Sequence, residues 1–154
     1  NGYNGTEYKV LDYTNKGFYD VAFKDDEKGA IITTEVDNSA STTSESPNQY
    51  ACENTFDKIY LLSYRDMYNS SYGFTDYESR YAKVTDYAKA NGTWWSTETE
   101  YLNNGYYWLR SPYYSDSYCA YVVYGDGSVN YYHYTHYVNG THYGVRVACN
   151  INLK

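Results

Sequence analysis

The chain has 154 residues, the length of one domain, and its net charge of −7 at pH 7 argues against a nucleic-acid backbone as partner, because binding one needs clustered Lys and Arg. It has no apolar run long enough to cross a membrane, so direct membrane insertion is not expected. Tyrosine is the outlier, with 25 copies. Each ring carries a hydroxyl that needs a partner or water, so many of these rings are expected at the surface.

The first third of the chain predicts short elements followed by a polar loop. Residues 25–30 favour a helical turn, because the acidic residues from Asp25 onward suit a helix N-terminus. Residues 30–36 are β-prone. Residues 38–48 are polar, which is typical of a mobile loop rather than of a linker between domains. A single domain is therefore expected over residues 1–154.

The middle of the chain predicts a strand and then a longer helix. Residues 58–62 form a short apolar run suited to a buried strand. Ser63 and Asp66 have the spacing of a capping box for the turn that follows. Residues 76–90 are expected to be helical and to end at an Asn-Gly pair, because four side chains fall on one helical face: Tyr77, Tyr81, Val84 and Ala88.

The last third of the chain turns to β structure. Residues 106–109 predict an aromatic strand that ends before Ser111-Pro112, and residues 120–124 and 129–132 flank a Gly-Asp-Gly-Ser turn that predicts a hairpin. Residues 144–153 alternate most regularly, and the face expected to fill the core carries Val145, Val147, Cys149, Ile151 and Leu153. The expected fold class is α+β, with short helices, a small twisted and mostly antiparallel sheet, and long loops.

Residues 106–144 have the composition of a binding surface. Tyr, Ser, Asp, Asn, His and Thr dominate between a few apolar anchors, and all three histidines of the chain lie here. Antibody loops use similar residues, because Tyr gives contact area at low rotamer cost and small polar residues give adaptable hydrogen bonds. High β-propensity explains some of these tyrosines, but not a run such as Tyr-Tyr-His-Tyr at 131–134. The candidate ligand-binding residues are Tyr113, Tyr114, Ser115, Asp116, Tyr118, Tyr121, Tyr124, Asn130, Tyr131, Tyr132, His133, Tyr134, His136, Tyr137, His142 and Tyr143.

Three sequence motifs resemble those of a bacterial family. They are DKIYLLS at residues 57–63, YWLRSP at 107–112 and GVRVACNINL at 144–153. With them, nearly the whole chain resembles C-type-lectin-like domains of the DUF6273 type. Such domains are often the variable proteins of diversity-generating retroelements, and they are distantly related in fold to formylglycine-generating enzymes. Val147 stands where the family usually has Pro, and the family usually has strands and a Trp further upstream, so additional N-terminal residues are expected.

The resemblance implies a C-type-lectin-type fold that displays a changeable ligand-binding surface. In such systems adenine-directed mutagenesis rewrites AAY codons, and the amino acids that these codons can reach match residues 113–143 closely. It further implies an adhesin or receptor-binding module outside the cell, on a bacterial surface or a virion, with an unknown protein or glycan as ligand. The alternative is an assembly module of a surface fibre, in which the tyrosines make the subunit contacts of a homo-oligomer.

Enzymatic, metal and cofactor roles are not expected. The histidines and cysteines lack the spacing of a zinc site, and the Glu-Pro-Asn and Trp-Asn-Asp motifs of calcium-dependent lectins are absent from the sequence. Cys149 is expected to be a buried, slowly reacting thiol. Cys119 has no His or Asp partner at a spacing diagnostic of a nucleophile.

Two further residue types are interpreted as structural. Arg110, within the YWLRSP motif, is expected to form an ion pair with an acid such as Asp57 or to bind backbone carbonyls. Trp94 and Trp95 follow the end of the expected helix, and at least one of the two rings is expected to pack inward.

Overall fold

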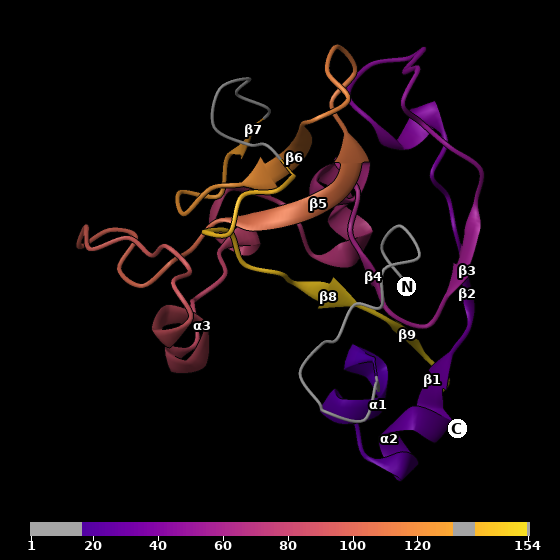
Figure 1. The fold of residues 1–154 in the computed structure, drawn as a ribbon, viewed down its shortest axis with the longest axis horizontal. Helices are drawn as coiled ribbons and strands as arrows, with labels where there is room; N and C mark the ends of the chain where they lie inside the picture. Colours follow the sequence, from indigo (N-terminus) through magenta and orange to yellow (C-terminus); the bar gives the residue numbers. More distant parts are fainter. Residues whose placement is uncertain (1–16, 131–137, 154) are drawn as a thin grey trace.

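The computed structural model describes residues 17–130 and 138–153, and these form an α+β domain (Figure 1). Its helices are short: α1 (Phe18–Ala22), α2 (Asp25–Ala30) and α3 (Asp86–Ala90). Single 3-10 turns cover Ala40–Thr42, Arg65–Tyr68, Ser70–Tyr72 and Glu78–Arg80. Within the described ranges the strands make four small antiparallel sheets. The expected class, α+β with short helices and small antiparallel sheets, is confirmed.

A three-stranded sheet forms the centre of the domain. It consists of β5 (Tyr107–Pro112), β6 (Ala120–Val123) and β7 (Val129–Asn130), in that order. β6 and β7 form the predicted hairpin, with Val123 paired to Val129, and Gly127 in its turn has a φ of +78°. β5 does not end before Ser111-Pro112 as expected. It continues through Pro112, because its register against β6 shifts after Trp108 and the strand pairs again at Pro112.

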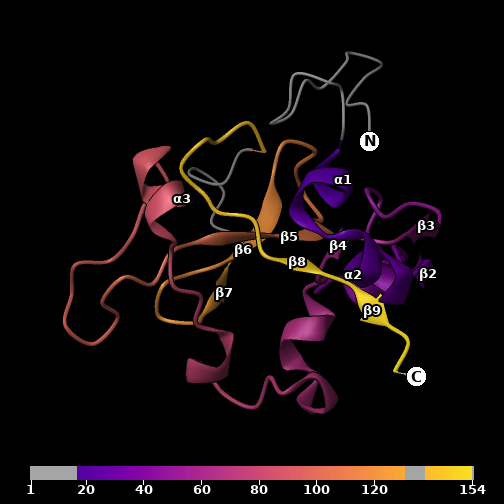
Figure 2. The same ribbon diagram turned by 90° about the horizontal axis from the view of Figure 1, so that it is seen from below.

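Of the three two-stranded sheets, two join the first half of the chain to its end and one lies within the first half. They pair β1 (Ile31–Ile32) with β9 (Asn150–Ile151), β2 (Thr34–Val36) with β3 (Thr55–Asp57), and β4 (Tyr60–Leu61) with β8 (Val147–Ala148). β8 and β9 follow one another from the central sheet towards α2 (Figures 1 and 2). The β-prone segment 30–36 and the strand expected in residues 58–62 are therefore confirmed, as is the helical turn in residues 25–30.

The core is aromatic as much as aliphatic. Its buried cluster contains Met67, Phe74, Tyr107, Leu109, Tyr113, Cys119, Tyr121 and Val123. The hydroxyl of Tyr107 donates to the carbonyl of Arg80 at 2.9 Å, and the hydroxyl of Tyr121 meets that of Ser44. Thr43 is also fully buried. The polar segment 38–48, expected to be a mobile loop, therefore packs on the core and supplies a polar partner to a buried ring.

The helix expected over residues 76–90 is wrong except for its last turn. Only Asp86–Ala90 is α-helical, and it is capped by Thr85, whose side chain accepts from the backbone N–H of Ala88. Residues 82–84 are extended, because the N–H of Val84 donates to Asn103 and the carbonyl of Ala82 accepts from Gly105. This pairing removes the helical face on which the expectation rested. The predicted end is correct, since Gly92 has a φ of +88°.

The expected core face of residues 144–153 is also wrong. Val145, Val147, Ile151 and Leu153 are exposed, by 67%, 37%, 54% and 84%. The segment does not form one central strand but two short pieces, each paired with a single partner strand. It instead turns Arg146 inward, where the guanidinium lies 5.7 Å from the ring centroid of Phe74 and 5.5 Å from that of Tyr107.

Candidate ligand-binding site

Arg110 of the YWLRSP motif links this motif to the DKIYLLS motif by hydrogen bonds. Its backbone N–H donates to Leu62 at 3.0 Å, and its Nη1 donates to the carbonyl of Leu61 and to Oδ2 of Asp66, both at 2.8 Å. Asp66 also accepts from the N–H of Ser63 at 2.7 Å, and the hydroxyl of Ser63 accepts from the N–H of Asp66, which confirms the capping box. The ion pair expected of Arg110 is present, but its acid is Asp66 rather than Asp57.

The third motif closes onto the same sheet. Gly144 donates to the carbonyl of Tyr106 at 2.7 Å and accepts from the N–H of Trp108 at 3.1 Å. Nη1 of Arg146 lies 3.3 Å from the hydroxyl of Tyr107, and β8 pairs with β4. The three motifs thus build the scaffold, and the tyrosine-rich residues 113–143 lie between two of them.

Five aromatic rings gather where this scaffold meets the tyrosine-rich segment; we call them the aromatic cluster. They are Trp94, Tyr106, Trp108, Tyr124 and Tyr143. The centroid of Tyr106 lies 4.3 Å from Trp94, 4.7 Å from Tyr124 and 5.9 Å from Tyr143, and Tyr143 lies 4.8 Å from Trp108. Trp94 is 42% exposed and the other four are half-buried. The cluster is therefore a partly open surface rather than a closed core.

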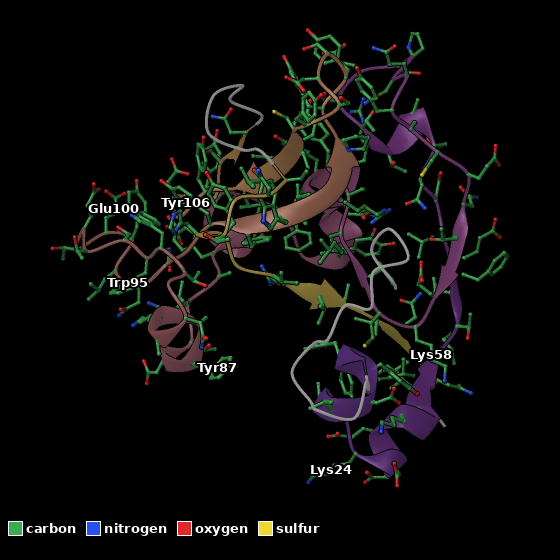
Figure 3. All side chains as sticks on the ribbon, in the orientation of Figure 1. Lys24, Lys58, Tyr87, Trp95, Glu100 and Tyr106 are labelled. Atoms are coloured by element: carbon green, nitrogen blue, oxygen red, sulfur yellow. The ribbon has the colours of Figure 1, made fainter. Side chains whose placement is uncertain are left out.

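A cavity of about 160 Å³ lies beside this cluster; we call it the aromatic cleft. It is lined by Trp94, Ser96, Glu98, Tyr101, Tyr106, Tyr124, Gly125 and Asp126. One wall comes from residues 91–105, an arm that projects from the sheet, and Figure 3 shows its Trp95 and Glu100 beyond Tyr106. Asn104, only 2% exposed, fixes the arm to the β6–β7 hairpin by donating to the carbonyl of Gly125 at 2.8 Å.

The charge of the aromatic cleft is carried by carboxylates. Burial raises the pKa of Tyr106, and the nearby charges of Asp126 and Glu98 raise it further. A hydrogen bond that the Tyr101 hydroxyl donates to the Glu100 carboxylate, together with burial, raises the pKa of Tyr101. Both phenols therefore stay neutral at physiological pH. The acidic side chains that line the cleft are Glu98 and Asp126.

The structure places the candidate residues in different environments. Tyr113 and Tyr121 are 6% and 0% exposed, so they belong to the core and not to the expected surface. The exposed residues are Tyr114, Ser115, Tyr118 and His142, and the half-buried ones are Asp116, Tyr124, Asn130 and Tyr143. Tyr131, Tyr132, His133, Tyr134, His136 and Tyr137 lie outside the described residues.

Sequence reasoning missed the contribution of the arm. The expectation that Trp94 or Trp95 packs inward is wrong, because they are 42% and 38% exposed. The N–H of Trp94 donates to the carbonyl of His142 at 2.9 Å, which brings the arm beside the end of the tyrosine-rich segment. The available signal was a Trp pair followed by Glu98 and Glu100, an aromatic and acidic composition unlike that of a core segment.

The described residues hold no group of three or more His, Cys, Asp or Glu that could bind a metal ion, and none of their helices is long and apolar enough to cross a membrane. All three cysteines are thiols. Cys52 is exposed, Cys119 is buried and Cys149 is half-buried, so the buried thiol is not the one expected.

Alkylation should rank the thiols in the same order. Burial raises the pKa of Cys119, and the charge of Asp116 adds to this, so less thiolate forms at any given pH. We expect iodoacetamide at pH 8 to modify Cys52 first, Cys149 next and Cys119 last, with the three rates becoming similar in urea. Peptide mass spectrometry over time measures this order. Fast native modification of Cys119 would contradict its place in the core.

One protein family model matches nearly the whole chain. The family model described as "Domain of unknown function (DUF6273)" matches residues 1–153, and the chain belongs to this family. Comparisons with curated proteins and with solved structures find no match.

Proposed function

We propose that this domain is a binding module whose ligand contacts the aromatic cluster and two exposed tyrosines of the loop that follows β5, Tyr114 and Tyr118. The observation that carries the proposal is the partly open aromatic cluster, built on a scaffold of three interlocked motifs. Aromatic rings concentrate at protein interfaces, where they give a large contact area at low entropic cost.

The scaffold and the surface are separable in this domain, which suits display. The motif contacts run mainly through backbone groups and the two arginines, Arg110 and Arg146, whereas Tyr114 and Tyr118 are 41% and 68% exposed. Substitution at such positions usually changes stability by under about 0.5 kcal/mol. The surface could therefore change its ligand without unfolding the domain.

We extend the proposal to the type of scaffold and to the location of the protein. We propose a C-type-lectin-type scaffold of the kind used by variable proteins of diversity-generating retroelements, acting outside the cell on a bacterial surface or virion. Its ligand would be a protein or a glycan, and no catalytic step or cofactor is required. The residue types of the segment, rather than any single residue, support this extension.

A paired substitution tests the binding role. Fluorescently labelled domain is added to fixed bacterial cells of several species and to a glycan array. The variant Tyr114→Ala/Tyr118→Ala should lose binding by at least about tenfold, because exposed tyrosines at an interface centre often dominate affinity. The control variant Tyr72→Ala/Tyr87→Ala removes two other rings that are 60% and 69% exposed, and it should bind normally.

Three results would count against the proposal: no binding to any cell or glycan, equal loss in both double variants, or unfolding of the first variant by circular dichroism. A wild-type protein that self-associates, with the association abolished by the first variant, would point to the assembly role instead. Analytical ultracentrifugation measures that outcome.

A further inference from the structure

We propose that the aromatic cleft binds a positively charged headgroup, an alkylammonium or trimethylammonium, carried by the ligand. This inference rests on the proposed binding function and names the chemistry of one part of the ligand. It follows from the rings that line the cleft, from its charge and from its size.

The rings of the cleft suit a cation. The π faces of Trp and Tyr carry negative potential, and ammonium groups bind to them in aromatic cages. Trp94 is 42% exposed, so part of its indole remains accessible, and Tyr106 and Tyr124 also line the cleft. Cleft walls of this kind favour a cation over a neutral group of the same shape.

Several aromatic rings elsewhere in the domain have a cation of their own. Arg80 lies 4.7 Å from the ring of Tyr68, Lys58 lies 4.7 Å from Tyr19, and Lys89 lies 5.6 Å from Trp95. Among the described residues, no Lys or Arg is placed in this way over Trp94 or Tyr106. The position that a lysine or arginine occupies at other rings is thus available to a ligand here.

The charges of the cleft have the matching sign. Glu98 and Asp126 line it, and none of its described lining residues is basic. Oδ1 of Asp126 accepts from the N–H of Ser128 at 2.9 Å and from its hydroxyl at 2.7 Å, so the hairpin turn fixes this carboxylate in place. After burial, the charges of both carboxylates contribute to raising the pKa of Tyr106, as expected for acids close to the aromatic wall.

The size of the cleft limits what enters it. Pockets that enclose a whole small molecule usually measure several hundred Å³, whereas this cleft has about 160 Å³. It accommodates one headgroup, and the remainder of the ligand would extend over the aromatic cluster.

The test compares two ligands of the same shape. Choline carries a trimethylammonium group, and 3,3-dimethyl-1-butanol carries a neutral tert-butyl group in its place. Isothermal titration calorimetry at constant ionic strength should show saturable binding of choline, with the neutral alcohol at least about tenfold weaker. Equal binding of both, or no saturation by choline, would overturn the inference.

Variants assign the binding to the cleft. Glu98→Gln/Asp126→Asn preserves side-chain shape, and the Asn oxygen can still accept from Ser128; it should weaken choline by at least about tenfold. Trp94→Leu keeps an apolar side chain but removes the π face, and it should weaken choline by about fivefold or more. The charge-matched control Asp26→Asn/Glu53→Gln, two exposed acids outside the cleft lining, should stay within about twofold of wild type, because distant exposed charges are screened.

Equal loss of choline binding in the control variant would mean that net charge, not the cleft, attracts choline.

The cation-binding inference can fail separately from the proposed binding function on which it rests. If labelled domain binds cells or glycans through Tyr114 and Tyr118 but choline does not bind, the module is a binder whose cleft is not a cation site. If neither experiment shows binding, both proposals fall.

Discussion

Replacing Tyr121 by Ala is expected to lower the free energy of unfolding by about 3–5 kcal/mol, the usual cost of deleting a large buried aromatic ring. Tyr121 is fully buried in β6, with ring centroids 4.9 Å from Tyr64 and 6.2 Å from Tyr113. Burial raises its pKa to about 12, so the phenol stays neutral and its hydroxyl remains bonded to Ser44. Urea denaturation followed by circular dichroism measures the loss.

Tyr118 provides the matched control, three residues earlier in the same segment. It is 68% exposed, so Tyr118→Ala should change stability by less than about 0.5 kcal/mol. The contrast tests whether one tyrosine-rich segment serves both core and surface. Similar losses at both positions would mean that the segment is entirely core, and the proposed binding surface would have to be abandoned.

Replacing Gly127 by Ala should be almost as damaging, at about 3 kcal/mol or more. Gly127 has a φ of +78°, and an added Cβ would lie 2.0 Å from the carbonyl oxygen of Tyr77. The turn would have to move away from Tyr77. That movement would strain the hairpin and disturb the Gly127 carbonyl, which accepts from Nη1 of the buried Arg80 at 3.3 Å. Thermal and urea unfolding both report the loss.

Gly73 serves as a control that separates the cost of a positive φ from the cost of the steric clash. Its φ is +86°, but an added Cβ would meet nothing within 4 Å. Gly73→Ala should therefore cost only about 1 kcal/mol, the cost of the left-handed conformation for a residue with a side chain. If both alanine variants lost the same stability, close packing under the hairpin turn would play no part.

Local chemistry was predictable from the sequence, whereas the choice of buried face was not. The capping box of Ser63 and Asp66 and the hairpin turn at Gly127 depend only on neighbouring residues, and both are present. The alternation of residues 144–153 indicated two different faces but not which one is covered. The covering rings, Phe74 and Tyr107, come from distant segments, and they select Arg146 for the interior.

The helix expected in residues 76–90 failed for a similar reason. The period of its apolar side chains was real, but the backbone of Val84 finds its partner at Asn103, and this non-local bond keeps the chain extended. Nothing in the sequence of residues 76–90 indicates that Val84 pairs with Asn103.

The candidate site was predictable by composition only in part. The tyrosine-rich segment supplied Tyr124 and Tyr143 to the aromatic cluster, but composition could not separate them from Tyr121, because Tyr suits both a core and an interface. Trp94 and Glu98 come from the arm. Their place in the cleft depends on the bond from Asn104 to Gly125, which joins residues 21 positions apart.

The pairing of β1 with β9 and of β4 with β8 bears on how the domain reaches its native state. The first pair joins strands near opposite ends of the described chain, and the second joins strands that are also far apart in the sequence, so closing either pair costs loop entropy before any contact compensates. The described helices are too short to persist alone and cannot act as early local nuclei. The backbone bonds between Tyr106 and Gly144 likewise form only after the intervening chain has been drawn together. Folding of this domain is therefore expected to depend on long-range closure.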